Sequence, residues 1–413
     1  MDVEIITIGD EVVTGHTVDT NSAFIGRALT EIGLRVKYKT SVGDELDTME
    51  EALRIGLKRA QVVITTGGLG PTDDDMTKRA IVKVFKRNLI FHEDVLEDIK
   101  ERYRRRGIDM PAINQNQALL PQGARFFPNK YGSAVGICIA EEGRIFIALP
   151  GVPMEMRQLV TDEVIPYLRS LKTGQTIKVI KLRTTGIIES ALAEMITSKI
   201  KIDSSINLGY LPSPCGVDLR IIATGSNDAD AEEKATALAE QLVDTVGKYL
   251  YGREEDSLES VVGKLLVERN QKMCVAESCT GGQLGMAITT IPGSSAHFQG
   301  GVISYSNDVK VWQLGVEEDL LATAGAVSEP CALAMALGAR KLFRCDYALS
   351  ITGIAGPDGG SEEKPVGLVY IGLSSEKRTF ARKFQFGSNR EFNRSRAVYA
   401  SLELLRREIL GIV

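Results

Sequence analysis

The polar stretch at residues 276–282, Ala-Glu-Ser-Cys-Thr-Gly-Gly, contains the residue types with the clearest capacity for chemistry. It lies between two apolar segments, which predicts a strand, a tight turn and a helix. The turn would place Ser278, Cys279 and Thr280 over a helix N-terminus, where free N–H groups favour developing negative charge. Such a turn can present a nucleophile and stabilise an oxyanion. In the structural alternative, Ser278 or Thr280 caps the helix, and Gly281 and Gly282 only permit the turn.

A base for such a nucleophile is expected to be lysine or tyrosine. The chain has three histidines, so a Ser-His-Asp triad in the C-terminal third would depend on His297 alone. A predicted strand over residues 300–305 ends at Tyr305, and Lys310 follows in the first turn of the next helix. One strand-to-helix junction can therefore hold a phenol and an ammonium close together. A lysine acts as a base only where burial or a neighbouring cation lowers its pKa toward neutrality.

Composition sets the broad class of the protein. At 413 residues the chain is too long for one core and should divide into two or three domains. A net charge of −5 gives no reason to expect a general nucleic-acid binder. The opening residues lack a signal-peptide pattern, and no apolar run reaches the ~20 residues of a membrane span, so we expect a cytoplasmic protein without membrane contact. The six cysteines form no C-x-x-C pair, so neither a zinc knuckle nor a disulfide framework is predicted.

The N-terminal part alternates strands and helices, which predicts a parallel sheet with helices on both faces. Loops at residues 9–21 and 65–75 fall at the carboxyl ends of its strands, where such sheets bind ligands. Three glycines in the second loop let backbone amides approach a phosphate, and three aspartates follow them, at positions 73, 74 and 75. The aspartates would repel a phosphate unless a divalent cation bridged the two, so we expect a metal-assisted phosphate site. Alternatively, the aspartates cap the helix that begins near Met76.

Two polar stretches, near residues 170–176 and 252–257, divide the rest of the chain. We therefore predict domains at residues 1–170, 171–252 and 253–413. The middle domain should be a compact α+β unit, with strands at 177–182, 206–211 and 217–224 and helices at 190–199 and 230–246. In the C-terminal domain, Ser328 is expected to cap a helix, and residues 352–360 form a glycine-rich loop able to wrap a ligand.

The final helix carries Arg390, Arg394 and Arg396 in its first turns. Cations at this end oppose the helix dipole, and a bound anion such as a 5′-phosphate would compensate them. The alternative is a solvated basic face, because surface charges usually contribute little.

The loops at residues 9–21, 66–74 and 149–153 together resemble the molybdopterin-binding-like domain at the N-terminus of CinA proteins. In that family the domain is associated with a metal-dependent pyrophosphatase acting on ADP-ribose, while the same fold also binds molybdopterin, so the substrate does not follow from the fold. The resemblance implies a divalent cation of the Mg, Mn or Co class. The implied phosphate-binding residues are Gly67, Gly68, Gly70, Thr72 and Ser133, and the implied metal ligands are Asp10, Asp73 and Asp74.

The middle unit resembles the KH-type module of the same family. It lacks the G-x-x-G loop that clamps a nucleic-acid backbone in true KH domains. We therefore expect a spacer or a dimerisation module, and we do not expect RNA binding.

Five blocks in the C-terminal third resemble, in order, the nicotinamide mononucleotide amidohydrolase of the PncC type, which forms the C-terminal part of CinA proteins. The blocks are residues 276–282, 301–310, 325–330, 350–360 and 364–367. The resemblance implies that Ser278 is the nucleophile, that Lys310 and Tyr305 transfer protons, and that Thr352 supports the substrate or the base. The implied substrate-binding residues are Thr280, Gly281, Gly282, Gly353, Gly356 and Arg390, the last at the nucleotide phosphate. Cys279 is a rival nucleophile that we assign to packing, because family members can carry leucine here and buried cysteines are usually inert.

Together these features predict an α/β chain made of a parallel-sheet molybdopterin-binding-like domain, a small α+β KH-type domain and an α/β amidohydrolase domain. We expect a bifunctional hydrolase of the pyridine nucleotide cycle that acts on nicotinamide mononucleotide and, with metal, on ADP-ribose. The amidase site should need no cofactor, and the family suggests a homodimer. Two alternatives are a binder of a molybdopterin-type ligand and a non-enzymatic interaction protein of competence or DNA damage.

Overall fold

The computed structural model describes residues 1–72, 75–171 and 176–412. They form two units: residues 1–178 with 224–232, and residues 179–223 with 233–412. Asp73 and Asp74 lie outside the described residues. Among the helices that the structure describes, none is both long enough and apolar enough to cross a membrane.

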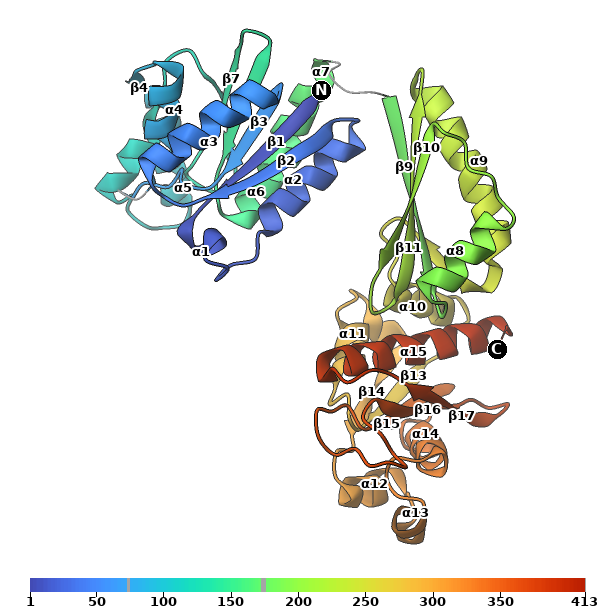
Figure 1. Ribbon diagram of the computed structural model, residues 1–413. Helices are drawn as coiled ribbons and strands as arrows, with labels where there is room; N and C mark the ends of the chain where they lie inside the picture. Colours follow the sequence, from blue (N-terminus) through green and yellow to red (C-terminus); the bar gives the residue numbers. More distant parts are fainter. Residues whose placement is uncertain (73–74, 172–175, 413) are drawn as a thin grey trace. The chain divides into compact units, whose positions relative to one another are not determined.

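The N-terminal domain is built on a six-stranded sheet with the order β2-β1-β3-β8-β7-β6 (Figure 1). Four strands are parallel: β1 (Asp2–Ile8), β2 (Arg35–Val42), β3 (Val62–Thr66) and β8 (Arg144–Leu149). Two antiparallel strands, β7 (Gly136–Glu141) and β6 (Arg125–Phe127), complete it, and β4 (Leu89–Phe91) pairs separately with β5 (Leu119–Pro121). The central strand β3 is buried throughout, which explains its continuous run of β-branched residues.

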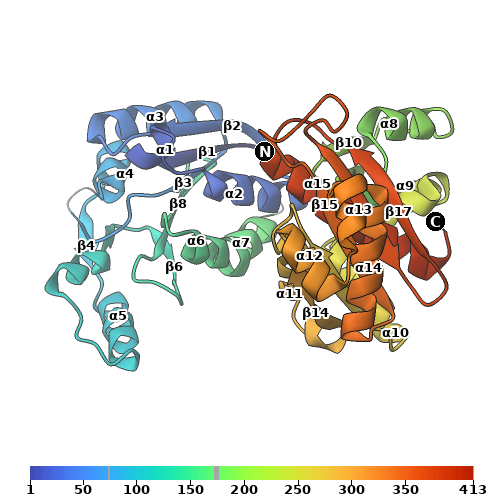
Figure 2. The ribbon, with the colours of Figure 1, turned by 90° about the horizontal axis from the view of Figure 1, so that it is seen from below.

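Helices cover both faces of this sheet, as Figure 2 shows for α3 on one side and α2, α6 and α7 on the other. The first face carries α3 (Leu46–Arg59), α4 (Thr77–Phe85) and α5 (Glu93–Arg105). The second carries α2 (Thr20–Glu31), α6 (Pro153–Leu159) and α7 (Ile165–Ser170), with the π-helical turn η2 (Val160–Val164) between the last two. Two short elements lie in loops: α1 (Asp10–Val13) and the 3-10 helix η1 (Ala112–Ala118).

The middle domain is a four-stranded sheet, with the order β10-β11-β9-β12, and α8 and α9 pack on one face (Figure 1). Its strands are β9 (Thr176–Thr185), β10 (Ile206–Pro212), β11 (Gly216–Gly225) and β12 (Leu250–Arg253). Its helices are α8 (Glu189–Thr197) and α9 (Asp228–Val246), followed by the turn η3 (Gly247–Tyr249). The sequence predicted all three other strands and both helices but neither β12 nor η3. The predicted polar break at residues 252–257 overlaps the end of β12, whose backbone pairs with β9 and whose Leu250 and Tyr251 side chains pack in the core.

The C-terminal domain has a five-stranded sheet with the order β14-β13-β15-β16-β17. The strands are β13 (Met273–Glu277), β14 (Phe298–Ile303), β15 (Tyr347–Gly353), β16 (Leu368–Ser374) and β17 (Thr379–Gln385); the first three are parallel and the last two antiparallel. One face packs against α10 (Leu258–Glu268), α11 (Gln283–Thr289) and α15 (Arg390–Leu410). The other packs against α12 (Asn307–Leu314) and α14 (Glu329–Phe343), with α13 (Glu318–Thr323) beside α14 and the turn η4 (Ser294–Ala296) before β14.

The predicted α/β fold class is therefore confirmed in both units. The parallel strands β13 and β15 end together, because their register pairs Met273 with Tyr347 and Glu277 with Ile351. The turn after β13 and the glycine-rich loop after β15 consequently emerge at the same edge of the sheet. This edge is where the candidate site forms.

Candidate functional site

The turn after β13 presents Ser278 at the carboxyl edge of the C-terminal sheet. The Ser278 N–H donates to the Ile351 carbonyl at 2.9 Å, so the residue continues the ladder before the chain turns. The Gly281 N–H then donates to the Ser278 carbonyl at 3.0 Å. Gly281 and Gly282 have φ values of 58° and 94°, which other residues adopt only with strain. The predicted strand, tight turn and helix are confirmed, and Gly281 and Gly282 are explained by backbone conformation.

Lys310 is the group that contacts the Ser278 hydroxyl. Its Nζ lies 3.3 Å from Ser278 Oγ and donates to the Ser304 carbonyl at 2.7 Å. The side chain is only 1% exposed, and within the described ranges no carboxylate forms an ion pair with it. Burial lowers the pKa of Lys310, and the nearby Cys331 and Cys279 thiols oppose this only partly. The sequence-based expectation of a lysine beside the serine is confirmed, and the lowered pKa favours the neutral amine that can accept a proton.

A pH dependence follows from this buried amine. Because Lys310 must be neutral to accept the Ser278 proton, we expect kcat/KM for amide hydrolysis to rise with pH and to level off once Lys310 is deprotonated. The pKa of Lys310 is lowered, so the midpoint of this limb should lie below 10.5, the ordinary value for lysine. A pH–rate profile on a neutral amide substrate measures the midpoint. A profile that is flat across the lysine range, or that falls through it, would contradict the assignment.

No histidine replaces the lysine as base. His297 comes directly before β14, and β14 runs parallel to β13 with Met273 paired to Phe298 and Glu277 paired to Ile303. His297 therefore lies at the amino edge of the sheet, opposite to Ser278. It packs against Gly263 of α10 as a buried side chain.

Glu277 occupies most of the free amides of α11. This carboxylate is 1% exposed and accepts from the N–H groups of Gly282 at 3.1 Å, Leu284 at 3.0 Å and Gly285 at 2.8 Å. A buried carboxylate needs such donors, and the positive end of the helix supplies them. We expected this turn to stabilise an oxyanion and Thr280, Gly281 and Gly282 to bind substrate. The N–H groups of Gly281 and Gly282 cannot serve in this way, because they are already bonded.

The amides of Cys279 and Thr280 are the remaining candidates. Neither N–H group has a backbone or side-chain acceptor in the part of the chain that the structure describes. The Thr280 side chain is fully buried, and its hydroxyl also has no partner. The Thr280 carbonyl accepts from Arg394 of α15 at 2.6 Å, which holds the turn just after these two amides. Two adjacent N–H donors directly after Ser278 are therefore available to an oxyanion.

Cys279 packs into the core of the domain. It is 8% exposed, and burial raises the pKa of its thiol to about 11. Since a thiol with this pKa carries almost no thiolate at neutral pH, the structure agrees with the assignment of Cys279 to packing. We expect Cys279→Ala to change kcat for amide hydrolysis by less than about threefold and to lower stability by about 1 kcal/mol through the lost burial of sulfur. Activity and thermal unfolding of the variant measure both, and a loss comparable with that of a nucleophile variant would contradict this role.

Tyr305 and Thr352 are placed differently from the expectation. The Tyr305 side chain is 64% exposed, and it is the Tyr305 carbonyl that lies near Lys310 Nζ, at 3.5 Å. The Thr352 hydroxyl is buried and donates to the Ala326 carbonyl at 2.7 Å, so it holds the loop before α14. The structure brings Ser278 and Lys310 together and leaves the Tyr305 phenol at the surface. Ser328 is confirmed as the N-cap of α14, where it accepts from the Cys331 N–H.

The three arginines of α15 do not form one anion site. The guanidinium of Arg390 is at the surface and donates to the Gly356 carbonyl at 2.8 Å, whereas Arg394 bonds to Thr280. Arg396 is about 200° from Arg394 around the helix and faces away from the serine turn. Of the three, Arg390 is the one that contacts the glycine-rich loop. In this loop, a side chain at Gly353 would collide with the Leu368 carbonyl and one at Gly356 with Val366, so both glycines have packing reasons as well.

In the N-terminal domain, the predicted loops do meet at one sheet edge. Asn21 donates to Thr66 Oγ1 at 3.1 Å and to the Gly151 carbonyl at 2.7 Å. The Gly67 N–H donates to the Leu149 carbonyl, and a side chain at Gly67 would strike the Ile8 carbonyl. Asn21 is buried, and its Oδ1 has no hydrogen-bond partner. Glycine at position 67 is therefore required by the close approach of three loops.

Two of the predicted phosphate donors are already bonded. The Gly70 N–H donates to Asp75 Oδ1 at 2.7 Å, and the Thr72 N–H and hydroxyl donate to Asp75 Oδ2 at 2.9 and 2.5 Å. The expectation that Gly70 and Thr72 are free donors is corrected, because their donor groups bond to the Asp75 carboxylate of the same loop. Gly68 has φ 64° and Ser133 is half-buried, and neither makes a hydrogen bond through its N–H or hydroxyl within the described residues.

The metal ligands are only partly visible. Asp10 follows β1, and its Oδ1 accepts from the Asp44 N–H at 3.2 Å, while Asp44 Oδ2 accepts from the Asp10 N–H at 3.0 Å. The other two predicted ligands, at positions 73 and 74, fall outside the described residues. Within residues 1–72, 75–171 and 176–412, no cluster of three or more His, Cys, Asp or Glu could hold a metal. The exposed Asp10 carboxylate and the half-buried Asp44 carboxylate, from the segments after β1 and β2, are oxygen donors of the kind that a hard divalent cation accepts.

Several residues that shape the sites were not found by motif reasoning. Glu277 and Asp75 were seen as acidic residues in promising loops, yet both consume the amides that the motifs seemed to offer. Arg394 and Asn393 tie α15 to the Thr280 turn and to the glycine-rich loop. The hydrogen bonds of Glu277 could have been predicted from general chemistry, because a buried carboxylate beside the start of a helix must accept from nearby N–H groups.

Models of known families match three consecutive parts of the chain. A probable molybdopterin binding domain matches residues 4–170, the damage-inducible protein CinA KH domain matches residues 181–252, and the CinA C-terminal domain matches residues 255–409. A CinA-like protein of Gemmatimonas aurantiaca is 43% identical over 411 residues, which cover 98% of this chain and 96% of the relative. A putative competence-damage inducible protein of Caldicellulosiruptor saccharolyticus is 39% identical over 408 residues, covering 99% of each chain. A crystal structure of a CinA protein of unknown function from Thermoplasma acidophilum is 38% identical, covers 40% of this chain and 97% of its own, and has a TM-score of 0.37.

The fold and these matches define a three-domain α/β protein that joins a molybdopterin-binding-type domain, a KH-type module and a third domain in which a half-buried serine contacts a buried lysine. Its relatives are similar along the full length of both chains. The chain belongs to the CinA family.

Proposed function

We propose that the protein is a cytoplasmic bifunctional hydrolase whose C-terminal domain converts nicotinamide mononucleotide to nicotinate mononucleotide and ammonia. The observation that carries this proposal is the 3.3 Å contact between the Ser278 hydroxyl and the buried Lys310 amine. A serine beside an amine with a lowered pKa is an arrangement for nucleophilic attack on a carbonyl without imidazole. The resemblance to the amidohydrolase family then supplies the substrate class.

The chemistry divides into acylation and deacylation. In acylation, Ser278 Oγ forms a bond to the carboxamide carbon and passes its proton to Lys310 Nζ, while the Cys279 and Thr280 amides receive the oxyanion. The C–N bond then breaks, and ammonia leaves with the proton from Lys310. In deacylation, water gives a proton to Lys310 and attacks the ester carbon, and Ser278 regains its proton as the acid leaves. Arg390, which bonds to the glycine-rich loop, would bind the nucleotide phosphate.

For the N-terminal domain we propose a metal-dependent pyrophosphatase activity on ADP-ribose. The loops that meet around Gly67 and Asn21, with backbone held close by glycine, favour a phosphate ligand at this sheet edge. Asp10, together with Asp73 and Asp74, would hold a divalent cation, which would neutralise phosphate charge when bound. The chain itself supplies the anchored loop, in which Asp75 fixes Gly70 and Thr72.

Two assays on the purified full chain test the two activities separately. Ammonia and nicotinate mononucleotide should appear in equal amounts from nicotinamide mononucleotide, with or without a metal chelator. Hydrolysis of ADP-ribose should require a divalent cation and stop on chelation. Absence of ammonia release would overturn the first assignment, and absence of ADP-ribose turnover with Mg²⁺, Mn²⁺ and Co²⁺ would overturn the second.

A second candidate for the N-terminal domain is binding of a molybdopterin-type ligand, since the family model for this part is that of a probable molybdopterin binding domain. Competition between ADP-ribose and a pterin phosphate separates the two: tight pterin binding without ADP-ribose turnover would favour the binder. We also propose that the protein is a homodimer and makes no direct nucleic-acid contact, as its net charge of −5 favours. A salt-sensitive shift on single-stranded DNA would favour the non-enzymatic alternative.

A further inference from the structure

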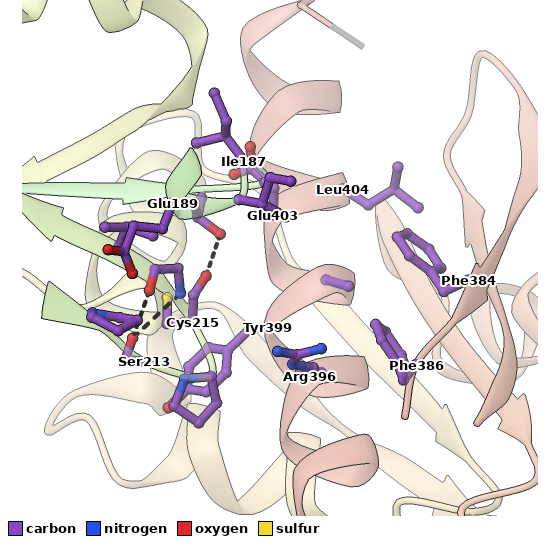
Figure 3. Close-up of a pocket in the computed structure, with 18 of the residues that line it drawn as sticks. Ile187, Glu189, Ser213, Cys215, Phe384, Phe386, Arg396, Tyr399, Glu403 and Leu404 are labelled. Carbon is purple, nitrogen blue, oxygen red and sulfur yellow. Dashed lines mark hydrogen bonds between the residues drawn. The ribbon is translucent and has the colours of Figure 1, made fainter. Parts of the chain in front are cut away.

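A groove of about 720 Å³ lies between the KH-type module and the C-terminal domain, away from the serine turn. One wall consists of two KH-module segments, residues 185–189 and 212–217, and another wall consists of β17 and the residue that follows it. Figure 3 shows α15 between these walls, with Cys215 and Tyr399 on one side and Phe384 and Phe386 on the other. We call this feature the interdomain groove. Its volume is within the range of small-molecule sites.

The β17 wall is aromatic and basic because of strand periodicity. Arg382, Phe384 and Phe386 alternate along the chain, so their side chains share one face. The two phenylalanine rings are stacked, with centroids 5.7 Å apart and planes 17° from parallel. Both rings are half-buried, so this face of β17 remains partly open. It forms an apolar platform bordered by a guanidinium.

The α15 floor results from helical periodicity. Arg396, Tyr399, Glu403 and Arg407 recur every three or four residues and all line the groove. This is the face opposite to Arg394, which bonds to the serine turn.

The charge in the groove is positive and partly uncompensated. The lining contains three arginines (Arg382, Arg396 and Arg407) and two glutamates (Glu189 and Glu403). Glu403 is shared, because Arg407 Nε lies 2.5 Å and Arg406 Nε 2.7 Å from its two oxygens. Arg407 Nη2 is buried without a hydrogen-bond partner, and a side chain at Gly186 would collide with it. Across the described residues, neither Arg382 nor Arg396 has a carboxylate within ion-pair distance.

We propose that the interdomain groove is a second ligand site, separate from the amidase centre, for a small anion that carries a planar aromatic ring, of the nucleoside monophosphate class. The ring would lie on the Phe384–Phe386 platform, and the anionic group would bind Arg382 and Arg396, which have no carboxylate partner among the described residues. Glu189 is placed to accept from a hydroxyl or amino group of the ligand. This inference does not depend on the activity assigned to either catalytic domain.

The test is isothermal titration of the full chain with adenosine 5′-monophosphate, adenosine and ribose 5-phosphate. We expect saturable binding of the nucleotide, with adenosine and ribose 5-phosphate each at least tenfold weaker, because each lacks one of the two recognition elements. Arg396→Gln and Phe384→Leu should each weaken nucleotide binding at least tenfold. The matched control is Lys383→Gln, which removes a positive charge from the same strand but from its opposite face, and it should bind like the wild type.

Hydrogen exchange on the same samples shows where the nucleotide binds. Nucleotide should protect residues 185–189, 212–217 and 382–386 in the wild type and not in Arg396→Gln. Arg396 is exposed and has no ion-pair partner among the described residues, so Arg396→Gln should remain folded. It therefore keeps the test valid if Phe384→Leu unfolds. Wild-type affinity in both groove variants would overturn the proposal. So would protection of the groove that rises with protein concentration without nucleotide, because a second copy of the chain would then be its occupant.

Discussion

Replacing Ser278 by alanine is expected to lower kcat for ammonia release from nicotinamide mononucleotide by at least about a thousandfold. The substitution removes the only hydroxyl that bonds to the Lys310 amine among the residues that the structure describes, with Ser278 Oγ at 3.3 Å. Stability should change by less than about 1 kcal/mol, since the hydroxyl makes a single hydrogen bond and the backbone N–H to Ile351 is kept. Coupled ammonia detection with thermal unfolding measures both quantities.

A lysine variant and the double variant test whether Ser278 and Lys310 act together. Lys310→Met keeps a long buried side chain but removes the base, so it should lose a similar factor. Because the two groups act as a unit, the double variant should be no slower than either single one. Losses that multiply in the double variant would indicate two independent roles. Wild-type turnover by Ser278→Ala would reject the serine mechanism.

Replacing Glu277 by alanine is expected to be the most destabilising change at the site, costing about 3 kcal/mol. The carboxylate is buried and serves three amides, those of Gly282, Leu284 and Gly285, and alanine would leave them without acceptors. The turn that holds Ser278 is built on these bonds, so kcat should fall with stability. Urea unfolding, monitored by circular dichroism, measures the free energy of unfolding.

Two control variants separate the role of Glu277 as a cap of α11 from a general effect of removing a negative charge. Glu277→Gln keeps the shape and at least one acceptor, so it should lie between the wild type and the alanine variant. Glu268→Ala removes an exposed glutamate of the same domain that has no described partner, and it should change stability by less than about 0.5 kcal/mol. Equal stabilities for Glu277→Ala and Glu268→Ala would contradict the capping role.

Much of the C-terminal site could be predicted from sequence because it depends on topology. Parallel strands bring their carboxyl ends together, so the Ser278 turn and the junction that contains Lys310 had to lie at one edge. The scarcity of histidine and the position of His297 before a strand excluded imidazole. These inferences need only the order of elements and the side-chain types at their ends.

The predictions of free backbone donors failed because nearby carboxylates compete for the same N–H groups. Gly282, Gly70 and Thr72 looked like free donors, but Glu277 and Asp75 occupy their amides. A motif shows which groups are near in sequence. Which of several acceptors bonds to a given N–H group depends on burial and geometry in three dimensions. Tyr305 failed for a related reason: the strand ends in the right place, but its side chain points to solvent and only its carbonyl reaches the lysine.

The 21-residue helix α15 has a consequence beyond packing. Its first turns bond to the loop and the turn of the serine centre, and about 20 Å further along, Arg407 lies in the interdomain groove. A helix is stiff over this length, so a tilt imposed at one end is passed to the other. The proposed hydrolysis at Ser278 should therefore respond to the packing between the KH-type module and the C-terminal domain, because one stiff helix contacts both places.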